Sequence, residues 1–174
     1  MDNPGYTIRN AVPTEFGTIG KLLVNVYSAL EGFPKESEQP GYYNMLVNVG
    51  DFTLNPANEL LVAVSADDKI AGAVVYFNDM QFYGSGGIAT LEQKAAGFRL
   101  LAVDPIMRGQ GIGKLLSIEC IRKAKESGRS QVIIHTTAAM QTAWKMYEGL
   151  GFRRSEVLDF MQGDLPVYGL RLLL

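Results

Sequence analysis

Three glycines and two basic residues between positions 108 and 114 have the composition of an anion-binding turn. The segment reads Arg108-Gly109-Gln110-Gly111-Ile112-Gly113-Lys114. It follows a short apolar run and precedes residues with helical periodicity, so the glycines stand at the N-terminal end of a predicted helix. There the first N–H groups lack partners within the helix, the helix dipole is positive, and missing β-carbons let a phosphate approach. The chemistry that the segment predicts is phosphate binding.

The spacing of these residues excludes two common phosphate-binding motifs. A P-loop would need a glycine in place of Arg108 and a Ser or Thr in place of Leu115. A dinucleotide fingerprint beginning at Gly109 would need a third glycine where Lys114 stands, and no acidic residue ends an obvious following strand. A nucleotide-binding protein is therefore disfavoured. The pattern that does match is Arg-x-x-Gly-x-Gly, over residues 108–113.

A second segment, from Ala143 to Phe152, places a tyrosine on the apolar face of a short helix that Gly151 closes. Its pattern is Ala-x-x-x-Tyr-x-x-x-Gly-Phe. Together with a Leu-x-Val-x-Pro strand end and Arg-x-x-Gly-x-Gly, it resembles the GCN5-related N-acetyltransferase (GNAT) family. The resemblance runs in element order from about Tyr6 to the end of the chain, and its specific part spans residues 98–152.

The resemblance implies acetyl-coenzyme A as cosubstrate and no metal. The pantetheine arm would lie between two splayed parallel strands and pair with the backbone of Leu101 and Val103. The residues that it assigns to the pyrophosphate are Arg108, Gly109, Gln110, Gly111, Ile112, Gly113 and Lys114. The alternatives are that the glycines only make a tight turn and that the arginine caps it at the surface.

The activity implied is transfer of an acetyl group to a primary amine of a small molecule or peptide, by direct attack in a ternary complex. Tyr147 would give a proton to the departing sulfur. The alternative for Tyr147 is a core residue. A coenzyme A-binding module of the same fold with little or no transferase activity is the competing function, which the retained tyrosine disfavours.

The sequence departs from the family at the base that deprotonates the amine. Many relatives carry a glutamate near the start of the central strand, where this chain has Gly97. We expect the proton to leave through water or through Glu92, the nearest carboxylate by sequence; the alternative for Glu92 is an exposed loop charge. His135 ends the parallel strand and is either a base or a structural histidine. Met140 stands where the family often has an asparagine near the cofactor.

Composition bounds the class of protein. The 174 residues are 47% hydrophobic and 20% charged, which is typical of a globular chain, and we predict one domain, 1–174. A net charge of −2 argues against nucleic acid as a partner.

The single cysteine, Cys120, falls on an apolar helix face, and we predict that it is a core residue. Neither a signal peptide nor a membrane helix is evident, so we expect a cytoplasmic protein without a membrane partner; a homodimer is compatible with the sequence.

The predicted fold is α/β (α+β): a GNAT-like mixed, mostly antiparallel central sheet with a splayed parallel strand pair, flanked by helices. The expected strands are residues 6–9, 59–65, 70–77, 98–103, 131–136, 152–158 and 168–173. The expected helices begin after Thr14 and at 40–49, 112–126 and 143–150. Between them we expect loops at 51–58 and 159–166, the latter bordering the acceptor, and a long loop at 78–96 that covers the substrate mouth or is disordered.

Overall fold

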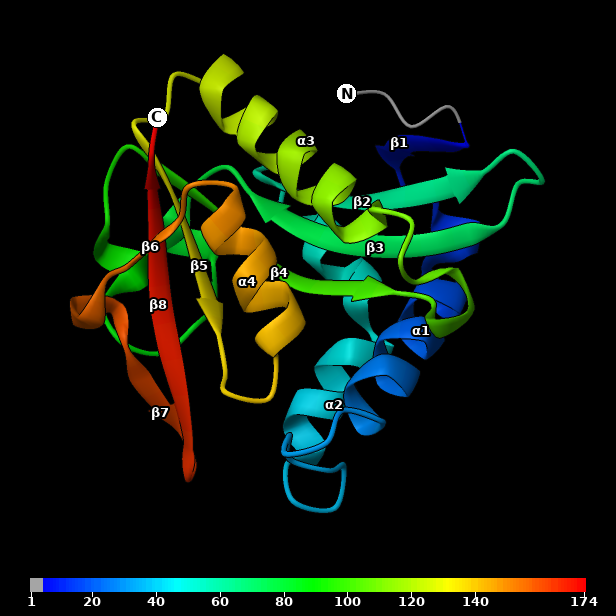
Figure 1. The fold of residues 1–174 in the computed structure, drawn as a ribbon, viewed down its shortest axis with the longest axis horizontal. Helices are drawn as coiled ribbons and strands as arrows, with labels where there is room; N and C mark the ends of the chain where they lie inside the picture. The colour runs from blue at the N-terminus through cyan, green and yellow to red at the C-terminus, as the bar shows by residue number, and fades with distance from the viewer. Residues whose placement is uncertain (1–4) are drawn as a thin grey trace.

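The computed structural model describes residues 5–174. An eight-stranded sheet runs through the molecule (Figure 1). The strand order is β1-β2-β3-β4-β5-β8-β6, with β7 paired to β8. The strands are β1 (Tyr6–Asn10), β2 (Asn58–Ser65), β3 (Ile70–Phe77), β4 (Ala95–Val103), β5 (Gln131–Thr136), β6 (Arg153–Arg154), β7 (Phe160–Gln162) and β8 (Leu165–Leu173). Among these residues only the β4–β5 pair is parallel, which confirms the predicted mixed sheet.

Helices cover both faces of this sheet. They are α1 (Phe16–Ser28), α2 (Pro40–Val47), α3 (Ile112–Glu126) and α4 (Gln141–Gly149). The β2 run Leu60–Val64 is apolar throughout because both of its faces are buried. Its residues 60, 62 and 64 pack with α1 and α2, and residues 61 and 63 pack in the cluster that contains α3 and α4. Figure 1 shows α3 and α4 on one side of the sheet and α1 and α2 on the other.

An extra residue in β4 bends the strand at the centre of the sheet. Ala73 of β3 pairs with Ala102, but Val75 pairs with Arg99, so β4 contains one more residue than β3 over this stretch. Leu100 has a φ of 60°, in the left-handed region that an L-residue other than glycine rarely adopts. A β-bulge bends its strand and increases the local twist.

The parallel strands β4 and β5 pair along only part of their length. Ala95–Gly97 pairs with Gln131–Ile133, and no pairing follows beyond these residues. The second edge of β5 pairs with β8 along its entire length. The two strands therefore diverge toward their C-terminal ends, as the expected splayed pair requires.

The region between β6 and β8 differs from the prediction. The expected strand at 152–158 is limited to Arg153–Arg154, followed by a 3-10 helix at Glu156–Leu158, and residues 159–166 are a hairpin of β7 and β8 instead of a loop. The cause is local hydrogen bonding. The Asp159 carboxylate accepts from Arg154 and from the backbone N–H of Gly169, each at 2.8 Å, and this turns the chain where alternation predicts an extended strand.

The long connection before β4 is ordered and packed. It contains 3-10 helices at Met80–Phe82 and Ala89–Leu91, and Tyr83 between them is fully buried in the core. The structure therefore shows an ordered connection instead of a disordered one. Strand β4 begins three residues earlier than predicted. The expected loop at 51–58 likewise begins with a 3-10 helix, Val49–Leu54.

Candidate functional site

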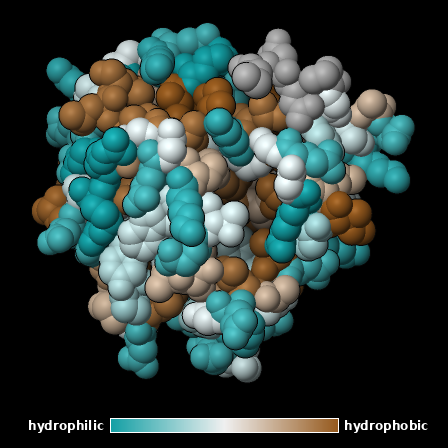
Figure 2. Space-filling view, viewed as in Figure 1, coloured by the Kyte–Doolittle hydropathy of each residue, from teal (hydrophilic) through white to brown (hydrophobic). Residues whose placement is uncertain are grey.

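A cleft of about 600 Å³ lies where β4 and β5 diverge. Its walls come from α1, from the bulged half of β4, from the N-terminal turn of α3 and from α4. Figure 2, viewed as in Figure 1, shows hydrophobic side chains between polar ones near the middle of the molecular surface. The cleft therefore occupies the gap that the unpaired strand edges leave in the sheet.

The glycine turn forms one end of this cleft. Gly109 and Gly111 have φ values of 80° and 78°, and a β-carbon added at either would meet no atom within 4 Å. Gly111 is the N-cap of α3, so open space faces the first N–H groups of a fifteen-residue helix. Arg108 and Lys114 are exposed at the rim and form no ion pair within residues 5–174. This end has the geometry and charge that a phosphate ligand requires.

Most of the residues predicted for cofactor binding lie together in the cleft. Those that line it are Leu101, Val103, Arg108, Gly109, Gly111, Ile112, Gly113 and Lys114. Gln110 is not among them: its side chain turns toward β1 and accepts a hydrogen bond from the Tyr6 hydroxyl at 2.5 Å. The Leu101 carbonyl accepts from the Tyr27 hydroxyl at 3.2 Å, which ties α1 to the bulged part of β4.

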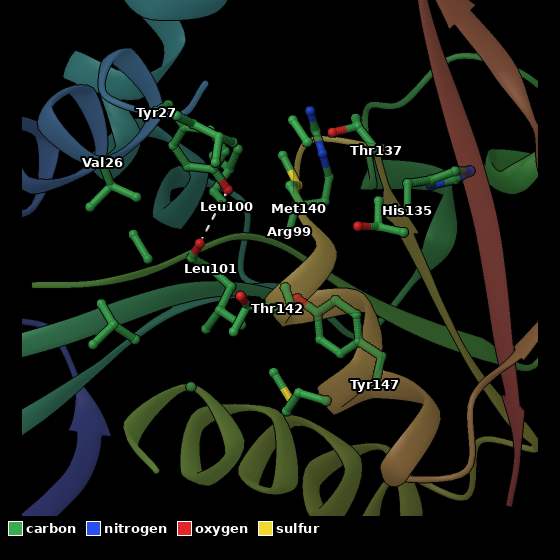
Figure 3. A pocket seen from close by; sticks show the side chains of 18 of the residues that line it. Val26, Tyr27, Arg99, Leu100, Leu101, His135, Thr137, Met140, Thr142 and Tyr147 are labelled. Carbon is green, nitrogen blue, oxygen red and sulfur yellow. Dashed lines mark hydrogen bonds between the residues drawn. The ribbon is translucent and has the colours of Figure 1, made fainter. Parts of the chain in front are cut away.

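Tyr147 also lines the cleft, from α4. Its ring is 6% exposed and packs edge-on against Phe98 and Phe152, with centroids 5.9 Å apart in both pairs. Burial raises the pKa of the phenol. The described residues offer no hydrogen-bond partner to its hydroxyl, which points into the cleft in Figure 3. Tyr147 thus holds a proton that a ligand in the cleft can accept.

Glu92, the carboxylate expected to serve as base, is not among the residues that line the cleft. Its carboxylate is 3.1 Å from Nη2 of Arg171 on β8 and accepts a longer hydrogen bond, of 3.4 Å, from Gln131 at the start of β5. That position is beside the paired ends of β4 and β5, whereas the cleft opens at their other ends. The ion pair therefore holds Glu92 against the last strand, away from the cleft.

Gly97 leaves no space for a side chain. A β-carbon would lie 2.7 Å from the Ile133 carbonyl oxygen and 2.8 Å from Sδ of Met80, both closer than real contacts. The ring of Tyr83 would be 3.0 Å away. The buried tyrosine thus occupies the space beside β4 where a longer residue would extend.

Tyr83 and His135 form a hydrogen-bonded pair in the cleft wall. The Tyr83 hydroxyl is 3.0 Å from Nδ1 of His135, and Nε2 is 2.8 Å from the carbonyl oxygen of Leu158. Since a carbonyl can only accept, Nε2 carries a hydrogen, and Nδ1 of the neutral ring accepts from Tyr83. Burial lowers the pKa of His135, so the ring is neutral at pH 7. Sequence reasoning left the role of this histidine open and missed Tyr83 as its partner.

Three further cleft residues have no motif that identifies them in the sequence. They are Arg99, Thr137 and Tyr27. Folding alone brings these three residues to one opening. The one hint in the sequence was Gly97, which departs from the glutamate that the family resemblance led us to expect. Within residues 5–174, no group of three or more His, Cys, Asp or Glu side chains is placed to hold a metal.

The sequence matches the model of the acetyltransferase (GNAT) family over residues 23–152, three quarters of the chain. The chain therefore belongs to the GNAT family of acyltransferases. A relative over much of its length is an uncharacterized N-acetyltransferase, YjgM, of Escherichia coli K12. It is 29% identical over 124 residues, which cover 70% of this chain and 72% of that protein.

Solved structures share the fold. A GNAT acetyltransferase from Staphylococcus aureus Mu50 has a TM-score of 0.73 at 16% identity, covering 97% of this chain and 98% of that one. YncA of Salmonella typhimurium, a putative acetyltransferase solved with its cofactor acetyl-CoA, has a TM-score of 0.69 at 15% identity, covering 97% and 94%. None of the helices in residues 5–174 is long and apolar enough to cross a membrane.

Proposed function

We propose that the protein transfers the acetyl group of acetyl-CoA to a primary amine of a small molecule or peptide while both substrates are bound. The observation that carries this proposal is one cleft that contains an open helix N-terminus, an unpaired strand edge and the Tyr147 hydroxyl. In the reaction a C–N bond forms, the C–S bond of the thioester breaks, the amine loses a proton and the sulfur gains one.

The residues present fit acetyl-CoA. The pyrophosphate would lie against the N–H groups of residues 109–114, where the glycines leave open space, with Arg108 adding charge. The amide groups of the pantetheine arm would pair with the backbone of Leu101 and Val103, on the edge of β4 that β5 leaves free. The YncA relative, solved with acetyl-CoA, supports this assignment. Acetyl-CoA supplies the activated thioester.

Tyr147 would donate its proton to the departing sulfur. Its raised pKa keeps the phenol protonated, and burial against two aromatic rings fixes its direction. A positioned general acid contributes typically about 10²–10⁴-fold to a rate. The Tyr147 hydroxyl lines the cleft and forms no hydrogen bond to a described residue, so it is available to a ligand.

The amine proton would pass to the Tyr83 oxygen, directly or through water, while the Tyr83 hydroxyl gives its own proton to Nδ1 of His135. The neutral ring accepts at Nδ1, while the Leu158 carbonyl holds the other nitrogen as a donor. This pair takes the role that the sequence left to water or Glu92. Because a primary amine near the pKa of lysine, about 10.4, is almost wholly protonated at pH 7, such an acceptor is needed.

Two measurements test the proposed function. Calorimetry with acetyl-CoA, with ATP as the control nucleotide, reports cofactor binding; release of free thiol in the presence of an amine panel reports transfer. We expect acetyl-CoA to bind, ATP to bind far more weakly, and thiol release to depend on an amine. Binding without amine-dependent release would instead favour the coenzyme A-binding module.

A further inference from the structure

Arg99 brings a positive charge without a counter-ion into the acceptor half of the cleft. Its Nη1 donates to the Tyr83 carbonyl at 2.9 Å, and its guanidinium carbon lies 5.6 Å from the centre of the Tyr83 ring. The contact of Nη2 is Sδ of Met45 at 4.0 Å, a weak acceptor. None of the ion pairs within residues 5–174 includes Arg99. A guanidinium has five N–H donors, so several remain for a ligand.

The charges that line the cleft all have the same sign. Its described lining contains Arg99, Arg108 and Lys114 and no Asp or Glu. Arg108 and Lys114 belong to the glycine turn, where the pyrophosphate is proposed to bind, whereas Arg99 stands on β4 beside Tyr83 and His135. An acceptor with a second cationic group, such as a polyamine, would meet repulsion here, and a carboxylate would meet attraction.

Thr137 provides a second polar group with no partner. The residue is 3% exposed, and its hydroxyl oxygen is buried without a hydrogen bond to any described residue. Buried polar groups are almost always hydrogen-bonded, so this hydroxyl calls for a ligand or water in the cleft. Figure 3 shows Thr137 and Arg99 on the same side of the opening as His135, away from Tyr147.

The remaining walls of this half are mainly apolar and aromatic, with Ser85 and Gln162 as polar exceptions. The walls include Tyr27, Leu30, Phe33 and Tyr42 on one side and Phe160 and Val167 on the other. Such walls accommodate an apolar side chain by removing its surface from water.

We propose that the acceptor is an α-amino acid with an apolar side chain, and that Arg99 and Thr137 bind its carboxylate. This inference rests on the proposed function and names the substrate class of the same site. A carboxylate accepts from both groups at once, and an arginine–carboxylate pair is among the strongest hydrogen-bonded contacts. The α-amine then lies on the side of the cleft where the Tyr83–His135 pair can take its proton.

Matched acids and amides test this proposal. The probes are L-phenylalanine with L-phenylalaninamide and L-leucine with L-leucinamide, which differ only in the carboxylate. We expect kcat/KM in the wild type to favour the acids by about tenfold or more, the scale of a hydrogen bond to a charged group. The amides have the less basic amines, so intrinsic reactivity at neutral pH opposes this preference.

Variants of Arg99 test whether this residue causes the preference for acids over amides. Arg99→Gln should lower the acid-to-amide ratio of kcat/KM by about 10- to 100-fold, and Arg99→Lys should restore part of that ratio. Arg122→Gln, which removes a paired arginine on the exposed face of α3, is the control and should leave the ratio unchanged. Calorimetry with L-phenylalanine added to CoA-saturated protein gives a readout independent of turnover, and Arg99→Gln should weaken this binding by a similar factor.

Equal or better turnover of the amides, or an Arg99→Gln loss that is the same for acid and amide, would overturn the proposal. So would transfer to other amines with none to these acids. If Arg99→Gln does not fold, the acid-to-amide ratios of the wild type and of Arg99→Lys decide. A protein that fails to bind acetyl-CoA, or that binds it and acetylates no amine, contradicts the proposed function itself.

Discussion

The hydroxyl oxygen of Tyr83 lies 3.0 Å from Nδ1 of His135, and the opposite nitrogen of that ring is held by the Leu158 carbonyl. The pair joins the connection before β4 to the end of β5, far apart in sequence. It fixes the tautomer of the histidine, so that its acceptor nitrogen faces Tyr83.

The first prediction concerns pH. Burial places the pKa of His135 below the ordinary value of about 6.5, so the base is protonated only in acid. With a basic amine, log(kcat/KM) should rise with pH because the amine must lose its proton, and should fall more steeply in the acid range below the lowered pKa of His135, where His135 also gains a proton. His135→Gln should remove that steeper limb and lower kcat/KM at pH 7 by about 10²-fold or more. Persistence of the limb in the variant would show that another group titrates.

The second prediction separates an acid from a core residue. Tyr147→Phe keeps the ring that packs on Phe98 and Phe152 and removes only the hydroxyl. We expect turnover to fall by about 10²–10⁴-fold while the Kd for acetyl-CoA changes little, since a general acid acts in the transition state. Turnover and calorimetry measure the two quantities. Equal losses in both, or a large fall in melting temperature, would instead assign Tyr147 to the core.

The third prediction tests the glycine turn. Gly111→Ala forces an L-residue into a φ of 78°, and Gly128→Ala does the same at 71° beyond the C-terminal end of α3, with open space at both positions. Each should cost about 1–2 kcal/mol of stability because of the backbone strain. Only Gly111→Ala should weaken acetyl-CoA binding, which calorimetry measures. Similar weakening by both variants would place the effect in general destabilisation.

The fourth prediction concerns Glu92. Glu92→Gln should leave kcat/KM and its pH profile nearly unchanged and lower stability by about 1 kcal/mol, because it breaks a partly buried pair with Arg171. Glu126→Gln, on the exposed face of α3, is the matched control and should change stability less. Urea unfolding and thiol release measure the two effects. A strong loss of kcat/KM at neutral pH that recovers at high pH would restore Glu92 as the base.

The fifth prediction explains the glycine of the central strand. Gly97→Ala should lower the free energy of unfolding by about 1–3 kcal/mol, because its β-carbon would meet backbone and two core side chains. Gly17→Ala, in α1 with no atom within 4 Å, should stabilise the protein by about 0.5–1 kcal/mol. Denaturant unfolding of the two variants checks both signs. A stable Gly97→Ala protein would mean that the neighbouring residues move apart.

The sequence by itself determined the turn and most of the sheet. Gly109 and Gly111 identify the helix start at Ile112 because positive φ and open backbone are local requirements. Apolar runs place β2, β3 and β5 within a residue or two, since a strand buried on both faces needs such runs. The same local patterns failed at residues 152–158, where Asp159 binds Arg154 and Gly169 and turns the chain.

Only the tertiary structure decided which charged and polar side chains share the cleft. Glu92 is near β4 in sequence, yet it pairs with Arg171 from the last strand. Tyr83 and His135 are 52 positions apart and meet because β5 lies beside β4. Arg99 carries no motif, and its proposed role depends on the absence of a counter-ion among its described neighbours. Contacts of this kind arise from chain segments that sheet pairing brings together, so no local periodicity encodes them.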